Sequence, residues 1–97
     1  MAMDPAHCNA FGNGIVGTTV NTMAPVTIQA RDGAGNPILV GGDIFLVKVN
    51  GVIYHNTDNG DGTYSAPYFV LTPGNYIVDI SSAGTQINNS PFTVTFT

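Results

Sequence analysis

Hydrophobic and polar residues alternate along this chain in short runs. The clearest alternation lies in residues 25–31, where Val26, Ile28 and Ala30 alternate with polar neighbours. A period of two is typical of a strand that is buried on one side and exposed on the other. No apolar pattern with the helical period of about 3.6 residues is sustained along the sequence. The pattern therefore predicts an all-β protein.

Turn-forming residues separate the alternating runs. Asn50-Gly51 is a strong signal for a tight hairpin, and Pro73-Gly74 indicates another turn. Residues 58–62 are rich in types that tolerate positive φ angles. About seven antiparallel strands between such turns predict an immunoglobulin-like β-sandwich. We expect these strands in residues 7–11 with a continuation at 16–20, and in 25–31, 43–50, 52–56, 63–69, 76–80 and 91–96.

The predicted strand at residues 43–50 has two different faces. One face carries only apolar side chains and is expected to pack in the core; it consists of Phe45, Val47 and Val49. The other face mixes apolar and charged side chains; it consists of Ile44, Leu46 and Lys48. Because successive side chains of a strand point to opposite sides, the second set should lie outside the core.

Composition and charge narrow the functional classes. The chain has 97 residues, which suits one domain. Charged residues make up 8% of it, against about 25% in ordinary soluble domains. The net charge is -4, with Lys48 and Arg31 as the two cations. Since no basic stripe is present to neutralise phosphates, we expect neither nucleic-acid binding nor attraction to anionic membranes.

The single cysteine, Cys8, cannot form a disulfide within the chain. A buried structural thiol is the favoured interpretation, and a cross-link between two chains is the alternative. No apolar run reaches the roughly 18 residues needed to span a bilayer, and we see no signal peptide. We interpret Met1-Ala2-Met3-Asp4-Pro5 as a cloning remnant, so that the folded domain would comprise residues 6–97.

Catalytic and metal sites are not indicated. The chain has two histidines, His7 in the first segment and His55 in a predicted strand, and neither is paired with a nucleophile by its spacing. Residues 58–61 have some likeness to a calcium loop, but Gly60 stands at position 3 of the loop, where a ligand oxygen is needed, and the chain contains no Glu. We therefore expect no catalytic residue, no cofactor and no metal ion.

Five motifs in order resemble the filamin-type (actin-binding protein 280-like) repeat. They are Ala10 to Ile15, Gly41-Gly42 followed by the apolar face of 43–50, Asp58 to Tyr64, Pro73 to Tyr76, and Ser90 to Phe92. The resemblance covers residues 6–97. It implies an immunoglobulin-like repeat in which Tyr76 forms a tyrosine corner, its hydroxyl tied back to the backbone.

The resemblance also implies a place for a partner. In filamin-type repeats a partner peptide adds as a strand in the groove beside strands C and D. Carried over to this chain, strand C comprises residues 43–50 and strand D residues 52–57. The residues expected to face the groove are Ile44, Leu46, Lys48, Tyr54 and Asn56. The alternative is that Ile44 and Leu46 are covered by a loop or by a neighbouring repeat.

Two functions follow from these observations. The first is a non-catalytic structural and interaction module of a larger protein, which spaces domains and binds a partner strand. The second is an extracellular adhesion or recognition domain of a cell-surface protein. The resemblance favours the cytoskeleton in the cytoplasm, whereas the low charge content favours the cell surface. We expect the isolated domain to be a monomer.

Overall fold

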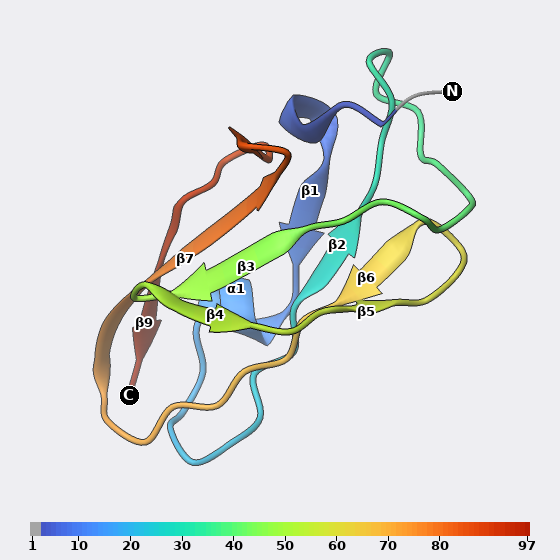
Figure 1. Cartoon of the computed structure of the whole chain (residues 1–97). Coiled ribbons are helices and arrows are strands. Elements are labelled where there is room, and N and C mark those ends of the chain that lie inside the picture. Colours follow the sequence, from blue (N-terminus) through green and yellow to red (C-terminus); the bar gives the residue numbers. More distant parts are fainter. Residues whose placement is uncertain (1–2) are drawn as a thin grey trace.

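The computed structural model describes residues 3–97, which form two antiparallel β-sheets packed face to face (Figure 1). One sheet has the order β1-β2-β6-β5. The other has the order β4-β3-β7-β8, and β9 also pairs with β7. The bounds of the first sheet are β1 Asn9–Phe11, β2 Thr27–Gln29, β5 Thr57–Asp58 and β6 Thr63–Ser65. Those of the second are β3 Leu46–Val49, β4 Val52–Tyr54, β7 Gly74–Ser82, β8 Thr85–Gln86 and β9 Phe92–Phe96.

The predicted all-β sandwich is confirmed. The described residues form more strands than the seven expected, for two reasons. The predicted strand at residues 52–57 is divided into β4 and β5, which belong to different sheets. A turn at Ala83 and Gly84 also folds β8 back onto the end of β7.

The beginning of the chain differs from the prediction. His7 ends a 3-10 helix, Pro5–His7, which the Asp4 carboxylate caps. Residues 13–16 form one helical turn, α1 Asn13–Val16, instead of a break followed by a strand at 16–20. Gly12 precedes this turn at a φ of 116°, and a Cβ there would lie 2.5 Å from the Pro25 carbonyl oxygen. The position before the helical turn therefore requires glycine, both for its φ and for space.

Residues 3–5 contact the rest of the domain. Met3 forms a bridge with Asp32, and the Asp4 amide donates a hydrogen bond to the Arg31 carbonyl at 2.8 Å. Met1 and Ala2 lie outside the described residues. The domain boundary expected at residue 6 stays a prediction.

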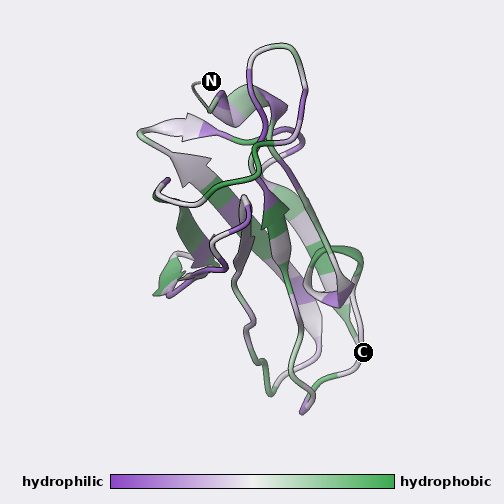
Figure 2. Ribbon diagram, turned by 90° about the vertical axis from the view of Figure 1, so that its right-hand side faces the viewer, coloured by the Kyte–Doolittle hydropathy of each residue, from purple (hydrophilic) through white to green (hydrophobic). Residues whose placement is uncertain are grey.

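The core lies between the two sheets. Alternate residues of β2, β3, β6, β7 and β9 point into it, and Figure 2 shows the change between hydrophobic and hydrophilic residues along the strands. Aromatic side chains join the sheets: the ring centroids of Phe45 and Tyr64 lie 4.8 Å apart, and those of Tyr68 and Phe96 lie 5.7 Å apart. The inward orientation predicted for Phe45, Val47 and Val49 is confirmed, because all three are buried.

The tyrosine corner is present. The Tyr76 hydroxyl donates to the Thr72 carbonyl, four residues upstream, and the Tyr76 ring packs edge-on against Phe96. A tyrosine in this position fixes the connection that enters β7. Among the described residues, no helix is both long and apolar enough to cross a membrane.

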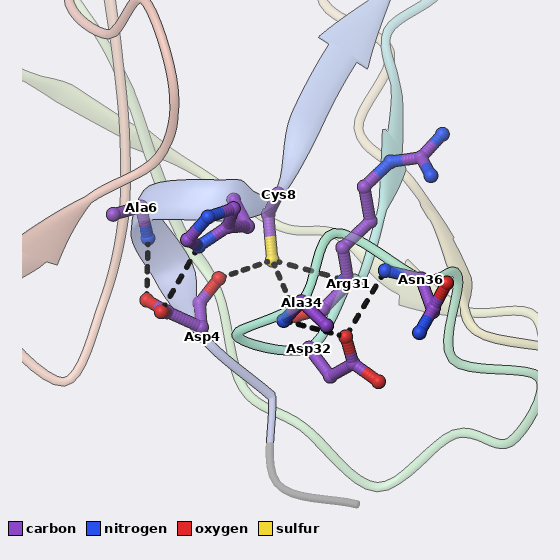
Figure 3. A network of polar contacts seen from close by, with 8 residues as sticks. Asp4, Ala6, Cys8, Arg31, Asp32, Ala34 and Asn36 are labelled. Atoms are coloured by element: carbon purple, nitrogen blue, oxygen red, sulfur yellow. Dashed lines mark hydrogen bonds and ion pairs between the residues drawn. The ribbon is translucent and has the colours of Figure 1, made fainter.

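Cys8 is buried, as the favoured interpretation of the single cysteine predicts. Its thiol lies beside the Asp4 carbonyl and accepts a hydrogen bond from the Arg31 amide at 3.4 Å (Figure 3). Burial raises the pKa of Cys8. A buried thiol of raised pKa is a poor nucleophile, so its role here is to pack the first segment against Arg31.

Candidate peptide-binding groove

A gap in strand pairing lies at one edge of the sandwich. β4 pairs with β3, whereas β5 pairs with β6 in the opposite sheet. The chain therefore crosses from one sheet to the other at residues 55–56 (Figure 1). Since β4 pairs only with Val47, Lys48 and Val49, the preceding residues 43–46 are not covered by β4. We call the space beside them the groove.

The groove is a real hollow in the surface. It has a volume of about 390 Å³ and is open to solvent on one side. Residues 43–46 line one wall, and residues 53–56 with Asp58 line the other. A hollow bounded by a partly unpaired strand is the geometry in which an extended peptide can add to a sheet.

Two of the predicted groove residues present exposed apolar surface. Ile44 is 83% exposed and Leu46 is 39% exposed, and both line the groove. The described chain therefore leaves them accessible, which argues against cover by a loop of this domain. The alternative that a neighbouring repeat covers them stays open.

Tyr54 lines the groove, as expected, but from the core face of β4 and not from its outer face. Tyr54 lies directly opposite Val47 in the register, so it shares the core face of that residue. Its ring lies 5.9 Å from that of Tyr68, in an edge-on arrangement, and is half-buried. The expectation rested on counting back along one continuous strand, but the change of sheet after Tyr54 breaks that count. Tyr54 thus forms the inner wall of the groove.

Asn56 braces the crossing between the sheets. Its side-chain amide donates a hydrogen bond to the Phe45 carbonyl at 2.7 Å. The contact ties the chain between β4 and β5 to the start of β3 at the point where backbone pairing has stopped. Asn56 lines the groove as expected, and it also holds the two walls together.

Lys48 does not line the groove. It lies on the outer face of β3, across from Ile53 in β4 and Asp79 in β7. The structure therefore brings Ile44, Leu46, Tyr54 and Asn56 to the groove but leaves Lys48 beside it.

Several groove residues were missed by sequence reasoning. Asp58 accepts hydrogen bonds from the Gly42 and Gly60 amides, each at 2.8 Å, and so joins the two loops at one end of the groove. The Asp43 amide donates to the Tyr64 hydroxyl at 2.9 Å. Both carboxylates line the groove together with Ile53 and His55. Asp58 was visible in the sequence only as a turn former, and Asp43 only as the residue before the alternating apolar face.

The electrostatics of this end are set by burial and by the two carboxylates. Burial raises the pKa of Tyr64 most, and the negative charges of Asp43 and Asp58 act in the same direction. Within residues 3–97 no group of three or more His, Cys, Asp or Glu side chains is placed to hold a metal ion.

Comparison with known proteins gives a matching family model and related sequences. A model described as Filamin/ABP280 repeat matches residues 2–93. Filamin-C of Mus musculus is 35% identical over 91 residues, which cover 94% of this chain and 3% of Filamin-C. The E3 ubiquitin-protein ligase TRIM45 of Homo sapiens is 32% identical over an alignment of 99 positions, which covers 95% of this chain and 17% of the ligase.

A solved structure has the same fold. The crystal structure of the Lin-41 filamin domain superposes with a TM-score of 0.79 and covers 100% of this chain and 98% of its own. The two sequences are 18% identical, so the match concerns the fold alone. This chain spans only a small part of the length of its filamin and TRIM relatives.

Proposed function

Because the chain belongs to the Filamin/ABP280 repeat family, we propose that it is a non-catalytic structural and protein-interaction module that binds a partner strand in the groove. The observation that carries the proposal is the interrupted pairing of β3, whose neighbour β4 covers only Val47, Lys48 and Val49. An incoming strand would continue the sheet along residues 43–46. Backbone hydrogen bonds supply affinity in this mode, and pockets for alternate side chains supply selectivity.

The apolar contacts of the groove support the same proposal. Ile44 and Leu46 expose apolar surface on one wall, and Ile53, which is 64% exposed, does so on the other. Burying such surface stabilises a complex by roughly 25 cal/mol per Å² before the cost of association is subtracted. The expected partner is an extended peptide with apolar side chains at alternate positions.

The shape of the domain supports a spacing role beside the binding role. The molecule is elongated, with extents of 41 × 21 × 19 Å. The start of the described chain, near the 3-10 helix at residues 5–7, and its C-terminal end lie toward opposite ends in both ribbon views (Figures 1 and 2). A domain entered at one end and left at the other adds length to a chain of domains.

Substitution of Leu46 tests the binding proposal. We expect Leu46→Glu to abolish binding of alternating apolar peptides and to leave the melting temperature nearly unchanged, because Leu46 is partly exposed and lies outside the core. Peptides of eight residues with alternating Val and Ser would be titrated into the labelled domain and followed by amide chemical shifts. In the wild type, the shifts should change at residues 43–46 and 53–56.

Ile77→Glu is the matched control. Ile77 lies in β7 of the same sheet, is 44% exposed and does not line the groove. It should bind the peptides as the wild type does. Equal loss in both variants, or shifts that map away from the groove, would exclude the groove as the binding site. A collapse of the melting temperature in Leu46→Glu would instead place that side chain in the core.

The low charge content favours a second candidate, an extracellular adhesion or recognition domain. The flanking sequence of the parent gene separates the two. A signal peptide and a membrane span would favour the second candidate, and an actin-binding domain or many tandem repeats would favour the first.

A further inference from the structure

The groove has negatively charged side chains as well as apolar walls. Asp43 and Asp58 line one end of it, and neither Lys nor Arg is among the lining residues of the described chain. Lys48 lies on the outer face of β3. Arg31 bonds to Asn9 and to the Gly35 carbonyl, and it does not line the groove. Lys48 and Arg31, the two cations of the chain, therefore both lie outside the groove.

Asp43 and Asp58 lie close to the same residues, Gly42 and Tyr64. The Gly42 amide, next to Asp43 in the chain, donates to the Asp58 carboxylate. The Tyr64 hydroxyl accepts from the Asp43 amide, and its pKa, raised chiefly by burial, is raised further by both charges. Each of the two Asp58 oxygens accepts one hydrogen bond in the domain, and a carboxylate has about four acceptor sites in all. The Asp58 carboxylate can therefore accept further hydrogen bonds from a donor group of a partner.

The groove also has a direction. Leu46 and Ile53 bring apolar surface to one part of it, and the carboxylates lie at the end where residue 43 begins the open edge. A strand that lies along this edge presents successive side chains to opposite faces, just as Leu46 lies on the exposed face of residues 43–46 and Asp43 on the face of Phe45. Its residues near Leu46 meet apolar surface, and its residue at the far end meets negative charge.

We propose that the groove selects a cationic strand, in which apolar residues at alternate positions lead to an Arg or Lys at the end that reaches Asp43 and Asp58. This inference rests on the proposed function, because it names the chemistry of the partner for the same groove. A cation there is attracted by two negative charges that no positive side chain of the groove neutralises. An acidic residue at the same place is repelled.

Two pairs of peptides test the inference. The probes are eight-residue peptides with alternating Val and Ser that carry Arg at either the first or the last position, each with a counterpart that carries Gln instead. We expect one of the two Arg peptides to bind roughly two- to fivefold more tightly than its Gln counterpart, as a partly exposed ion pair provides. The preference should shrink in 0.5 M salt, because the Debye length falls to a few Å.

Asp43→Asn should reduce the preference for Arg, and Asp79→Asn should not. Asp79 lies across from Lys48 on the outer face of the sheet, so its substitution makes the same change in net charge outside the groove. Equal affinity of the Arg and Gln peptides for the wild type, with Leu46→Glu still abolishing binding, would overturn the charge preference and leave the groove as a strand site. Failure of every peptide to bind the wild type would overturn the proposed function together with this inference. If Asp43→Asn does not fold, the wild type alone tests the charge preference: a preference for Arg that does not shrink in 0.5 M salt would overturn it.

Discussion

Gly62 packs its backbone against the loop that carries Ile38. A Cβ at residue 62 would lie 1.6 Å from the Ile38 carbonyl oxygen, and the residue has a φ of 91°. Gly60, two residues earlier, also has a positive φ, 81°, but a Cβ there meets nothing within 4 Å. In the turn at residues 58–62, Gly60 is therefore needed for its positive φ alone. Gly62 is needed for its positive φ and also because a side chain would collide with the Ile38 carbonyl.

Alanine at each glycine separates the two requirements. We expect Gly60→Ala to lower the free energy of unfolding by about 1 kcal/mol, the cost of a left-handed conformation for a residue with a side chain. Gly62→Ala should cost more than about 3 kcal/mol, since a backbone carbonyl must also move. Urea unfolding of both variants measures the difference. Equal costs would contradict the close approach of residues 38 and 62.

At the scale of the element, the strand that crosses between the sheets shapes the groove. β4 completes a hairpin with β3 through the Asn50-Gly51 turn, and β5 then joins β6. The Asn56 amide, bonded to the Phe45 carbonyl, spans the resulting gap, and the Asp58 carboxylate, bonded to the Gly42 amide, spans it at one end. The openness of the groove is therefore fixed by hydrogen bonds as well as by strand pairing.

Loss of this brace should loosen the groove locally. We expect Asn56→Ala to lower the free energy of unfolding by about 1 kcal/mol, the typical contribution of one hydrogen bond. Amide hydrogen exchange should accelerate mainly in residues 53–58, because the other strands keep their pairing. Asn88→Ala, at an exposed asparagine, is the control and should change neither quantity. Uniform acceleration across the domain would show that Asn56 supports the whole fold instead.

The sequence predicts the element that is regular and misses the one that is not. Alternation identifies the faces of residues 45–49 correctly, since β3 is paired and continuous there. The same reasoning does not show that Tyr54 lies on the core face of β4, because a count along residues 52–57 crosses from one sheet to the other. The helical turn at residues 13–16 is missed because four residues are too few to show a helical period, and its Gly14 amide bonds to the Pro25 carbonyl, which is remote in the sequence. The acidic end of the groove likewise arises when Asp43 and Asp58 meet through folding.

At the scale of the whole molecule, buried polar groups that stay neutral join segments that are distant in the sequence. The Tyr68 hydroxyl donates to the Gly14 carbonyl at 2.6 Å, which joins the β6 side of the sandwich to α1. Burial, with smaller contributions from Tyr54 and Tyr76, raises the pKa of Tyr68 to about 12. Burial raises the pKa values of Tyr64 and Cys8 as well. All three groups are therefore neutral in the folded domain well above neutral pH.

This arrangement predicts unfolding in alkali. A group whose pKa is raised by folding stabilises the folded state below its unfolded pKa, and that contribution disappears as the pH rises through the folded value. For Tyr68 the loss should run from about pH 10, its unfolded pKa, to about pH 12. Tyr68→Phe should be less stable at pH 7, since the Gly14 carbonyl loses its partner, but its stability should fall less steeply above pH 10. Urea unfolding at several pH values measures both effects, and parallel pH profiles would contradict the assignment.

The two aspartates at the open edge bear on how copies of the domain meet one another. An unpaired strand edge is a template on which another chain can extend the sheet, and natural proteins often protect such edges with charge. Each copy carries a net charge of -4, and Asp43 and Asp58 add negative charge at the open edge itself, so two such edges repel one another as they approach. The edge that would accept a basic strand therefore disfavours pairing with itself, which keeps crowded copies of the domain apart.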